Sequence, residues 1–191
     1  MKEIDRREFL KFGAAACAGV ATNLILTPVS LGANKATEKI TGNPAGNANT
    51  SEKAEKACED SENKEKCVNE YKFSNAEKTL FTFVTPINEE VAYRALPSLV
   101  VSEMDNRPEP FKDIVGGTWS DIGMTRRELL FGVASSVIFG ALHNITDSGV
   151  DLKTIPTSQT MAGGVYWYLQ RKFGVVSNTV AHVLNNFRAL W

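Results

Sequence analysis

The chain has 191 residues, of which 43% are hydrophobic, and its formal net charge is −1. This length suits one ordinary domain with a short additional segment. The near-zero net charge argues against a nucleic-acid partner, because binding to phosphates needs clustered Lys and Arg. The average composition hides an uneven distribution, since charged residues concentrate in the first half of the chain and apolar residues in the second.

Residues 1–33 have the pattern of an export signal. The segment Asp5-Arg6-Arg7-Glu8-Phe9-Leu10-Lys11 resembles a twin-arginine translocation motif, and the apolar stretch 12–26 follows it. Residues 30–33 (Ser-Leu-Gly-Ala) resemble a small-residue cleavage site, with an imperfect fit to the A-x-A pattern. The segment is therefore either a signal peptide that is removed or an N-terminal helix that stays as an anchor.

Residues 34–79 are polar and densely charged. They contain too little apolar surface to offset the entropy lost on ordering, so the composition predicts a flexible spacer. Cys58 and Cys67 lie nine positions apart in this segment. In an exported protein this arrangement favours a local disulfide, or two unused thiols, over a metal site, because zinc sites have shorter Cys spacings and more ligands.

Residues 80–191 are predicted to form an all-α core. Apolar residues run too continuously here for the alternation of strands, and the runs are longer than typical strands. The predicted helices correspond to four apolar segments, 80–102, 129–146, 154–170 and 173–187. A loop that contains Pro and many charges is expected from Glu103 to Arg127.

The ends of the predicted helices are marked by residue type. Thr85 and Pro86 suit an N-cap and a first helical position, and Asn88 is the alternative cap. Gly149 and Gly174 fit the breaks between helices.

A membrane location is expected for the helical bundle. A spanning helix needs about twenty mostly apolar residues, and segment 129–146 approaches this, with Arg126 and Arg127 before it. Frequent Ser, Thr and Gly suit close helix packing in lipid. We therefore expect a bundle in contact with membrane lipid, with a soluble bundle beyond the cytoplasmic membrane as the alternative.

Three polar clusters interrupt the apolar segments. They are Glu89-Glu90-Val-Ala-Tyr-Arg94, Phe139-Gly-Ala-Leu-His143 and His182-Val-Leu-Asn-Asn186, which include both histidines of the chain. Residues four positions apart lie on one face of a helix. Several helices are therefore expected to bring their polar faces together into one site.

The glutamates of the first cluster point about 100° apart on a helix, so different roles are expected for them. Arg94 lies one turn after Glu90 and is expected to pair with it. Glu89 would then face a cavity and act as a general base. The alternative is that both carboxylates complement a helix dipole or form a surface pair.

The two histidines would complete a hydrolytic site. His143 would share a water with Glu89, directly or through a metal, whereas His182 and Asn186 would donate hydrogen bonds to a developing oxyanion. Each histidine taken singly has a structural role as its alternative. A peptide or protein substrate is the expected partner.

The ordered set Glu-Glu-x-x-x-Arg, Phe-x-x-x-His and His-x-x-x-Asn resembles the motifs of the CAAX protease and bacteriocin-processing (CPBP) family of intramembrane proteases. These hydrolases are also called Abi or type II CAAX prenyl proteases. The resemblance covers residues 80–191. It implies a membrane endopeptidase with transmembrane helices.

The resemblance also implies roles for the residues. Glu89 would activate water with His143, and His182 with Asn186 would stabilise the tetrahedral intermediate. The remaining two charged residues, Glu90 and Arg94, would support the site. Family members are described as metalloproteases, and a metal-free glutamate mechanism has also been proposed. The implied cofactor is therefore either a zinc ion on Glu89, His143 and His182 or none.

Two hypotheses about function follow. The first is a CPBP-like endopeptidase of the cell membrane that cleaves a peptide at or beyond the cytoplasmic membrane. The second is a non-catalytic, membrane-associated helical protein, an immunity or scaffold factor, in which the polar clusters stabilise the fold and a partner is bound.

Overall fold

The computed structural model describes residues 6–43, 45–104, 124–146 and 149–191. Most of these residues are helical, as the sequence predicts. Asp5 of the export motif and most of the loop predicted at 103–127 lie outside them.

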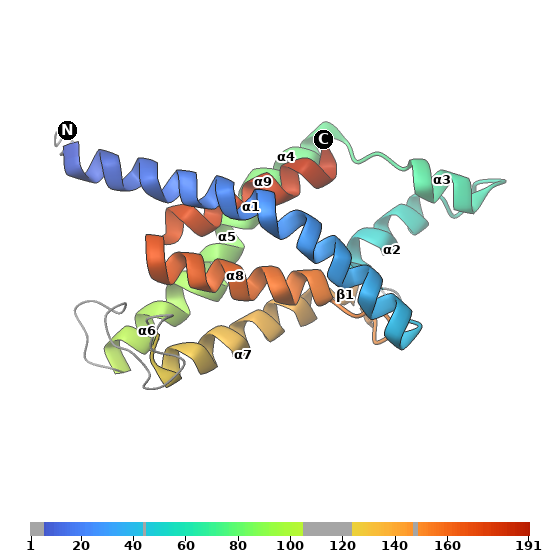
Figure 1. Ribbon diagram of the computed structural model, residues 1–191. Helices are drawn as coiled ribbons and strands as arrows, with labels where there is room; N and C mark the ends of the chain where they lie inside the picture. Colours follow the sequence, from blue (N-terminus) through green and yellow to red (C-terminus); the bar gives the residue numbers. More distant parts are fainter. Residues whose placement is uncertain (1–5, 44, 105–123, 147–148) are drawn as a thin grey trace.

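Figure 1 shows the order of the elements along the chain. The helices are α1 (Arg6–Thr41), α2 (Ala48–Ala57), α3 (Lys64–Glu70), α4 (Asn75–Thr79), α5 (Thr85–Glu90), α6 (Leu96–Met104), α7 (Arg126–Leu142), α8 (Thr157–Phe173) and α9 (Val175–Leu190). Two π-helical turns, η1 (Leu80–Val84) and η2 (Val91–Ala95), join α4, α5 and α6 into one helical stretch. The strands β1 (Ile145–Thr146) and β2 (Gly149–Val150) pair antiparallel between α7 and α8.

The first predicted core helix begins earlier than expected. A capping box at Ser74 and Glu77 starts α4, because their side chains satisfy backbone N–H groups that lack helical partners. The prediction of a cap at Thr85 or Asn88 is wrong, since the chain is already helical at Val84 and no side-chain cap bond forms there. Pro86 follows the turn η1, where a shifted hydrogen-bond register suits a residue without an N–H.

The helix breaks at glycine are confirmed. Gly174 has φ = +82° between α8 and α9, and Gly149 has φ = +128° in the hairpin between α7 and α8. Both angles lie in a region that residues with a Cβ rarely adopt. The break at Gly174 reverses the chain, so that α9 packs against α8.

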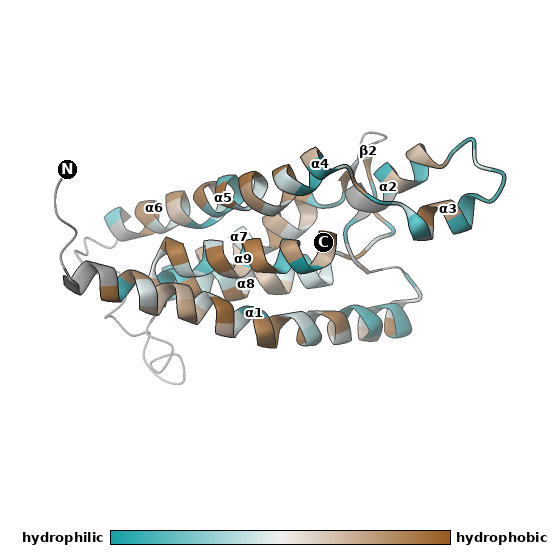
Figure 2. Cartoon of the chain, turned by 90° about the horizontal axis from the view of Figure 1, so that it is seen from above, coloured by the Kyte–Doolittle hydropathy of each residue, from teal (hydrophilic) through white to brown (hydrophobic). Residues whose placement is uncertain are grey.

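The core helices form a bundle with α1 on one side. In Figure 2, α1 and the stretch from α4 to α6 lie on opposite sides, with α8 and α9 between them. The helix α7 packs against α8, and α1 packs against both α8 and α9. The buried apolar cluster contains one residue of α1, Leu26, with Ala162, Tyr166, Leu169 and Ala181 from α8 and α9.

The segment predicted as a flexible spacer contains helices in the structure. Residues 34–41 continue α1, and α2, α3 and α4 follow. Little of this order comes from an apolar core. The Cys58–Cys67 disulfide, confirmed with a Cα–Cα distance of 5.7 Å, joins the residue after α2 to the middle of α3. Side-chain caps at Asn63 and Ser74 begin α3 and α4. Amino-acid composition alone does not predict helices that depend on a disulfide or on capping side chains.

Among the described residues, one helix is long and apolar enough to cross a membrane, α1 from Leu10 to Thr41. This statement concerns length and composition. Large apolar side chains are also exposed on the outer faces of the bundle. They include Phe83, Ile87 and Val91 on the stretch from η1 to η2, and Leu130, Val133 and Val137 on α7.

Candidate functional site

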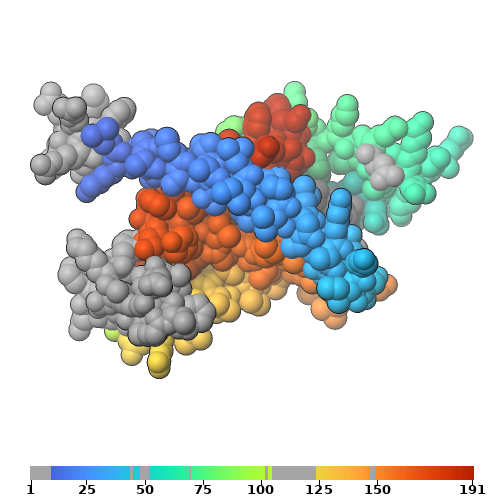
Figure 3. All heavy atoms as spheres, in the orientation of Figure 1, coloured from blue at the N-terminus to red at the C-terminus, as the bar shows by residue number. Residues whose placement is uncertain are grey.

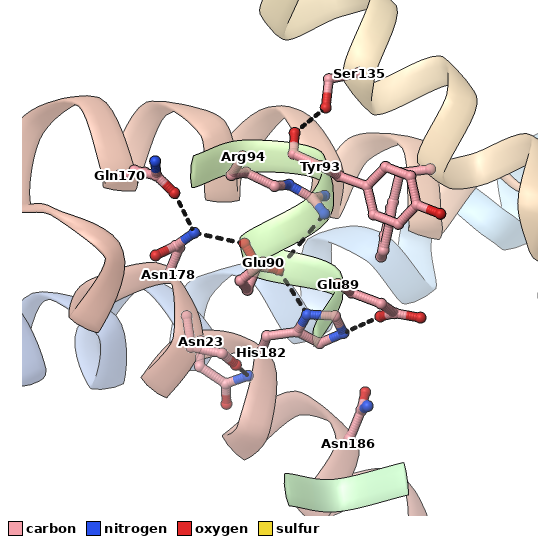
Figure 4. A network of polar contacts seen from close by, with 12 residues as sticks. Asn23, Glu89, Glu90, Tyr93, Arg94, Ser135, Gln170, Asn178, His182 and Asn186 are labelled. Atoms are coloured by element: carbon pink, nitrogen blue, oxygen red, sulfur yellow. Dashed lines mark hydrogen bonds and ion pairs between the residues drawn. The ribbon is translucent and has the colours of Figure 1, made fainter. Parts of the chain in front are cut away.

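The first and third polar clusters meet inside the bundle, as Figure 4 shows, and Phe139 of the second cluster packs against His182. Glu89 and Glu90 end α5, Arg94 lies in the turn η2, and His182 lies midway along α9. Glu90 and His182 are 92 positions apart in the sequence, and their side chains are hydrogen-bonded. Tertiary packing therefore brings the first and third clusters into direct contact.

Glu90 is the centre of a buried network. Its Oε1 lies 2.7 Å from Nδ1 of His182 and 3.6 Å from a guanidinium nitrogen of Arg94. The Nδ2 of Asn178 donates to its Oε2 and also donates to Gln170, at 3.0 Å. Glu90 and Arg94 are 0% exposed. A carboxylate taken fully out of water needs such partners. We call Glu90, Arg94, Asn178 and His182 the Glu90 network.

The network fixes the orientation of His182. Because carboxylates only accept, Nδ1 donates its proton to Glu90. The ring of Tyr166 stacks on the imidazole with 4.9 Å between ring centroids, and Phe139 packs its edge at 5.8 Å. The other nitrogen, Nε2, then faces the carboxylate of Glu89 at 3.5 Å.

His143 ends α7 and is oriented by its own helix. Its Nδ1 lies 2.7 Å from the carbonyl oxygen of Phe139. A carbonyl only accepts, so Nδ1 carries the proton and a neutral ring keeps a lone pair on Nε2. The ring of Phe139 packs against His143 at 4.6 Å and against His182 at 5.8 Å. One aromatic side chain therefore separates and positions the two imidazoles.

Glu89, His143 and His182 line one cavity of about 680 Å³. Tyr93 and Phe139 form part of its apolar wall. The side chain of Glu89 keeps 23% of its surface exposed, whereas Glu90 is completely covered. The two neighbouring carboxylates thus differ as the helical geometry predicts: one faces an open space and the other faces buried partners.

An adjoining cavity of about 390 Å³ shares both histidines with the first. Its opposite wall comes from α1, through Leu26, Ser30 and Asn34. The imidazoles therefore lie where the two spaces meet.

The charge of Arg94 is balanced by more than its ion pair with Glu90. Its guanidinium lies 4.0 Å from the ring centroid of Phe139 and 5.7 Å from that of Tyr166. Aromatic faces attract cations, most strongly where water is absent. Arg94 thus joins the Glu90 network to the aromatic residues that hold the imidazoles.

Asn186 has a different partner from the one expected. It lines both cavities, one turn after His182, but its Nδ2 donates to the carbonyl of Phe81 at 2.8 Å. This bond satisfies a carbonyl in the turn η1. In the structure, Asn186 therefore joins α9 to η1 instead of pointing a free donor at Glu89.

A metal ion needs several ligand atoms at one point. Each imidazole has its Nδ1 engaged and its Nε2 available, the arrangement usual for a metal-binding histidine. Within the described ranges, however, no three His, Cys, Asp or Glu side chains gather closely enough to hold a metal. The geometry does not supply the predicted three-ligand site, so the zinc prediction stays a prediction.

Several residues of the site lie outside the motifs. Asn178 and Gln170 position Glu90, and Tyr166 stacks on His182. Asn178 could have been found from the sequence, because it precedes His182 by four positions, as His182 precedes Asn186. Polar residues at this spacing form a stripe along an otherwise apolar helix.

Comparison with known families gives one result, at the N-terminus. The family described as TAT (twin-arginine translocation) pathway signal sequence matches residues 3–22. This match indicates export across a membrane. No curated protein and no solved structure is significantly similar to the chain.

Proposed function

We propose that the protein is an endopeptidase of the CPBP type, embedded in the membrane, which hydrolyses a peptide bond with a water activated by Glu89. The observation that carries the proposal is the position of Glu89. Its carboxylate lies in an open cavity, 3.5 Å from an imidazole nitrogen whose ring is fixed by a second carboxylate.

The first step uses the acceptors of this cavity. A water between Glu89 and His143 would donate one hydrogen to the carboxylate and the other to the Nε2 lone pair of the imidazole. Glu89 takes a proton from this water while the oxygen attacks the carbonyl carbon of the scissile bond. A positioned general base of this kind contributes roughly 10²–10⁴-fold to a rate.

The second step uses His182. In this step His182 would carry a second proton, taken up from solvent before the substrate binds and kept throughout the cycle. Its Nδ1–H is then bonded to Glu90, and its Nε2–H points into the cavity, where it donates to the tetrahedral oxyanion. Collapse of the intermediate breaks the C–N bond, and Glu89 gives its proton to the leaving amine. The products are a carboxylic acid and an amine, and Glu89 is ionised again.

The substrate is a peptide or protein that meets the enzyme at or beyond the cytoplasmic membrane. The twin-arginine match at residues 3–22 supports this location. The Cys58–Cys67 disulfide supports it as well, because disulfides persist in oxidising compartments. The cavity of about 680 Å³ has room for several side chains of a peptide.

A peptide-library cleavage assay tests the proposal. The purified full chain is compared with Glu89→Gln, which keeps the shape of the side chain and removes the base. Glu55→Gln is the matched control, because Glu55 is exposed on α2. We expect the control to cleave like the wild type and Glu89→Gln to lose roughly 10²–10⁴-fold in rate while unfolding at the same temperature.

Cleavage that survives in Glu89→Gln would contradict the proposal. A wild type that cleaves no peptide, together with variants that only lose partner binding, would favour the scaffold hypothesis instead. The zinc content of the same preparations, measured by mass spectrometry, decides whether a metal belongs to the site.

A further inference from the structure

An export signal that is cleaved off is absent from the mature protein. In this structure, however, α1 packs against the core from Ala15 onward. Its bundle-facing positions are Ala15, Gly19, Asn23 and Leu26, which are all buried. They recur every three or four residues, the spacing of one helix face. Figure 3 shows α1, in blue, lying across α8 and α9, in orange and red.

The closest approach lies within the stretch that matches the export signal. A Cβ on Gly19 would come within 2.4 Å of the carbonyl oxygen of Ser177 and 3.2 Å of the backbone nitrogen of Ala181. Only glycine permits the backbones of α1 and α9 to come this close. A signal that served export alone would not need this fit.

Polar contacts continue the interface beyond Gly19. The buried Asn23 donates from Nδ2 to the carbonyl of Ala181 at 3.1 Å, the residue just before His182. Further along, Asn34 donates to Ser158 at 3.2 Å and accepts from the backbone N–H of the same residue at 3.1 Å. Burying a side-chain amide without hydrogen-bond partners costs free energy. The partners of these asparagines lie on α8 and α9, so the polar groups of α1 complement those of the two helices.

The segment that resembles a cleavage site borders this interface. Residues 30–33 lie inside the continuous helix α1. Ser30 bonds to the carbonyl of Thr27 at 3.0 Å and lines the cavity that contains His143 and His182. Proteolysis needs locally unfolded backbone, so cleavage at residues 30–33 would first require this part of α1 to unfold.

We infer that the helix carrying the twin-arginine signal is not removed after export but stays as a permanent part of the fold, forming one wall of the cavity that contains the histidines. Its outer face carries Leu24, Ile25 and Val29, which are exposed and apolar. That face suits the lipid surface, while the other face is packed on the protein. The inference concerns processing and packing, and it does not depend on peptidase activity.

The first test is the mass of the exported chain. The full chain with a C-terminal tag is produced in a bacterium with the twin-arginine pathway, and the exported fraction is analysed by intact mass spectrometry. The non-exported Arg6→Lys/Arg7→Lys variant gives the mass of the unprocessed chain. We expect the two masses to differ by the substitutions alone. An exported chain that begins near Asn34 would overturn the inference.

The second test asks whether α1 is held by packing. A recognition site for a specific protease is inserted between Gly42 and Asn43, just after α1, and the folded protein is cut in detergent. We expect the α1 fragment to co-elute with the core, and to be released when Gly19 is changed to Leu. The matched control is Gly13→Leu, because a Cβ on Gly13 meets nothing within 4 Å. Release of the wild-type fragment, or equal release from both variants, would overturn the inference.

Discussion

Glu89 and Glu90 are adjacent in the chain, but their surroundings assign them opposite roles. Glu90 is enclosed by Arg94, Asn178 and His182, whereas Glu89 faces the cavity. In the proposed reaction, Glu90 would act on the imidazole of His182 and not on the substrate. Glu90 is therefore a positioning residue, and Glu89 is the candidate base.

Glu90→Gln is expected to lower stability more than any change at Glu89. The substitution leaves the buried Arg94 without its counter-charge, and breaking a buried pair in this way costs about 3–5 kcal/mol. Thermal unfolding of the purified protein in detergent measures the loss. The double variant Glu90→Gln/Arg94→Met removes both charges, so its loss should be smaller than the sum of the two single losses. Additive losses would mean that the two side chains do not depend on each other.

The sequence predicts which residues belong to this site, but it predicts few of the contacts between them. The i,i+4 spacing correctly predicted the pairing of Glu90 with Arg94. The contact between Glu90 and His182 was not predicted, because it depends on how α5 packs against α9. The partner of Asn186 is also not predictable from the sequence. It is a carbonyl in a π-helical turn, and no residue pattern predicts such a turn.

The helices α7 and α8 are packed through small residues. A Cβ on Gly163 would lie 3.0 Å from the Cα of Ser136 and 3.1 Å from a guanidinium nitrogen of Arg94. The neighbouring Gly164 is exposed, and a Cβ there would meet only Ser136, at 3.7 Å. Close helix contact at Gly163 thus also places Arg94 in the network.

Alanine substitutions at these neighbours should have opposite effects. Gly164→Ala should stabilise the protein by roughly 0.4–1 kcal/mol, because alanine restricts the unfolded chain and favours the helix. Gly163→Ala has the same intrinsic gain in stability, but its methyl group must push α7 and α8 apart. We therefore expect a net loss of stability. Unfolding midpoints of the two variants check this. Equal stabilisation by both would show that the helices are not in close contact at Gly163.

The hairpin of α2 and α3 is linked to α4 by a charged contact. Lys53 of α2 lies 3.0 Å from Glu77 of α4, which also completes the capping box with Ser74. The hydrogen bond from Lys53, followed by those from Ser74, lowers the pKa of Glu77 from 4.5 to about 2.

This lowered pKa predicts a pH-dependent contribution of Glu77 to stability. A carboxyl whose pKa is lower in the folded state stabilises the fold above its unfolded pKa, and the effect is lost as the pH falls through the folded value. The difference in melting temperature between wild type and Glu77→Gln should therefore shrink as the pH falls from about 5 towards about 2. A difference that stays constant over this range would show that the contact does not titrate.

The sequence predicts the core helices well and the segment before them poorly. The core segments are recognisable because apolar runs of this length are too long for strands and favour helices. Residues 34–79 lack such runs, and their helices depend on the Cys58–Cys67 disulfide and on side-chain caps. The sequence does not decide the role of α1, because its apolar residues suit a removed signal and a packed helix equally well.

Large apolar side chains are exposed on the outside of the bundle. Val137 on α7 is 53% exposed, and Leu152 after the hairpin is 88% exposed. If α7 faces lipid, Val137→Arg should cost about 2.5–3.5 kcal/mol at the membrane centre. Leu152→Arg is the control and should change stability by no more than about 0.5 kcal/mol. Unfolding in bilayer nanodiscs distinguishes the two, and equal small effects would favour a soluble bundle.

The proposed mechanism requires that Glu89 and His143 act together on one water. The most direct measurement is kcat for Glu89→Gln, His143→Ala and the double variant, once a cleaved peptide is known. Residues that act as a unit lose their function together, so the double variant should be hardly slower than the slower single variant. Losses that multiply in the double variant would mean that the two side chains act independently, and the shared-water mechanism would be wrong.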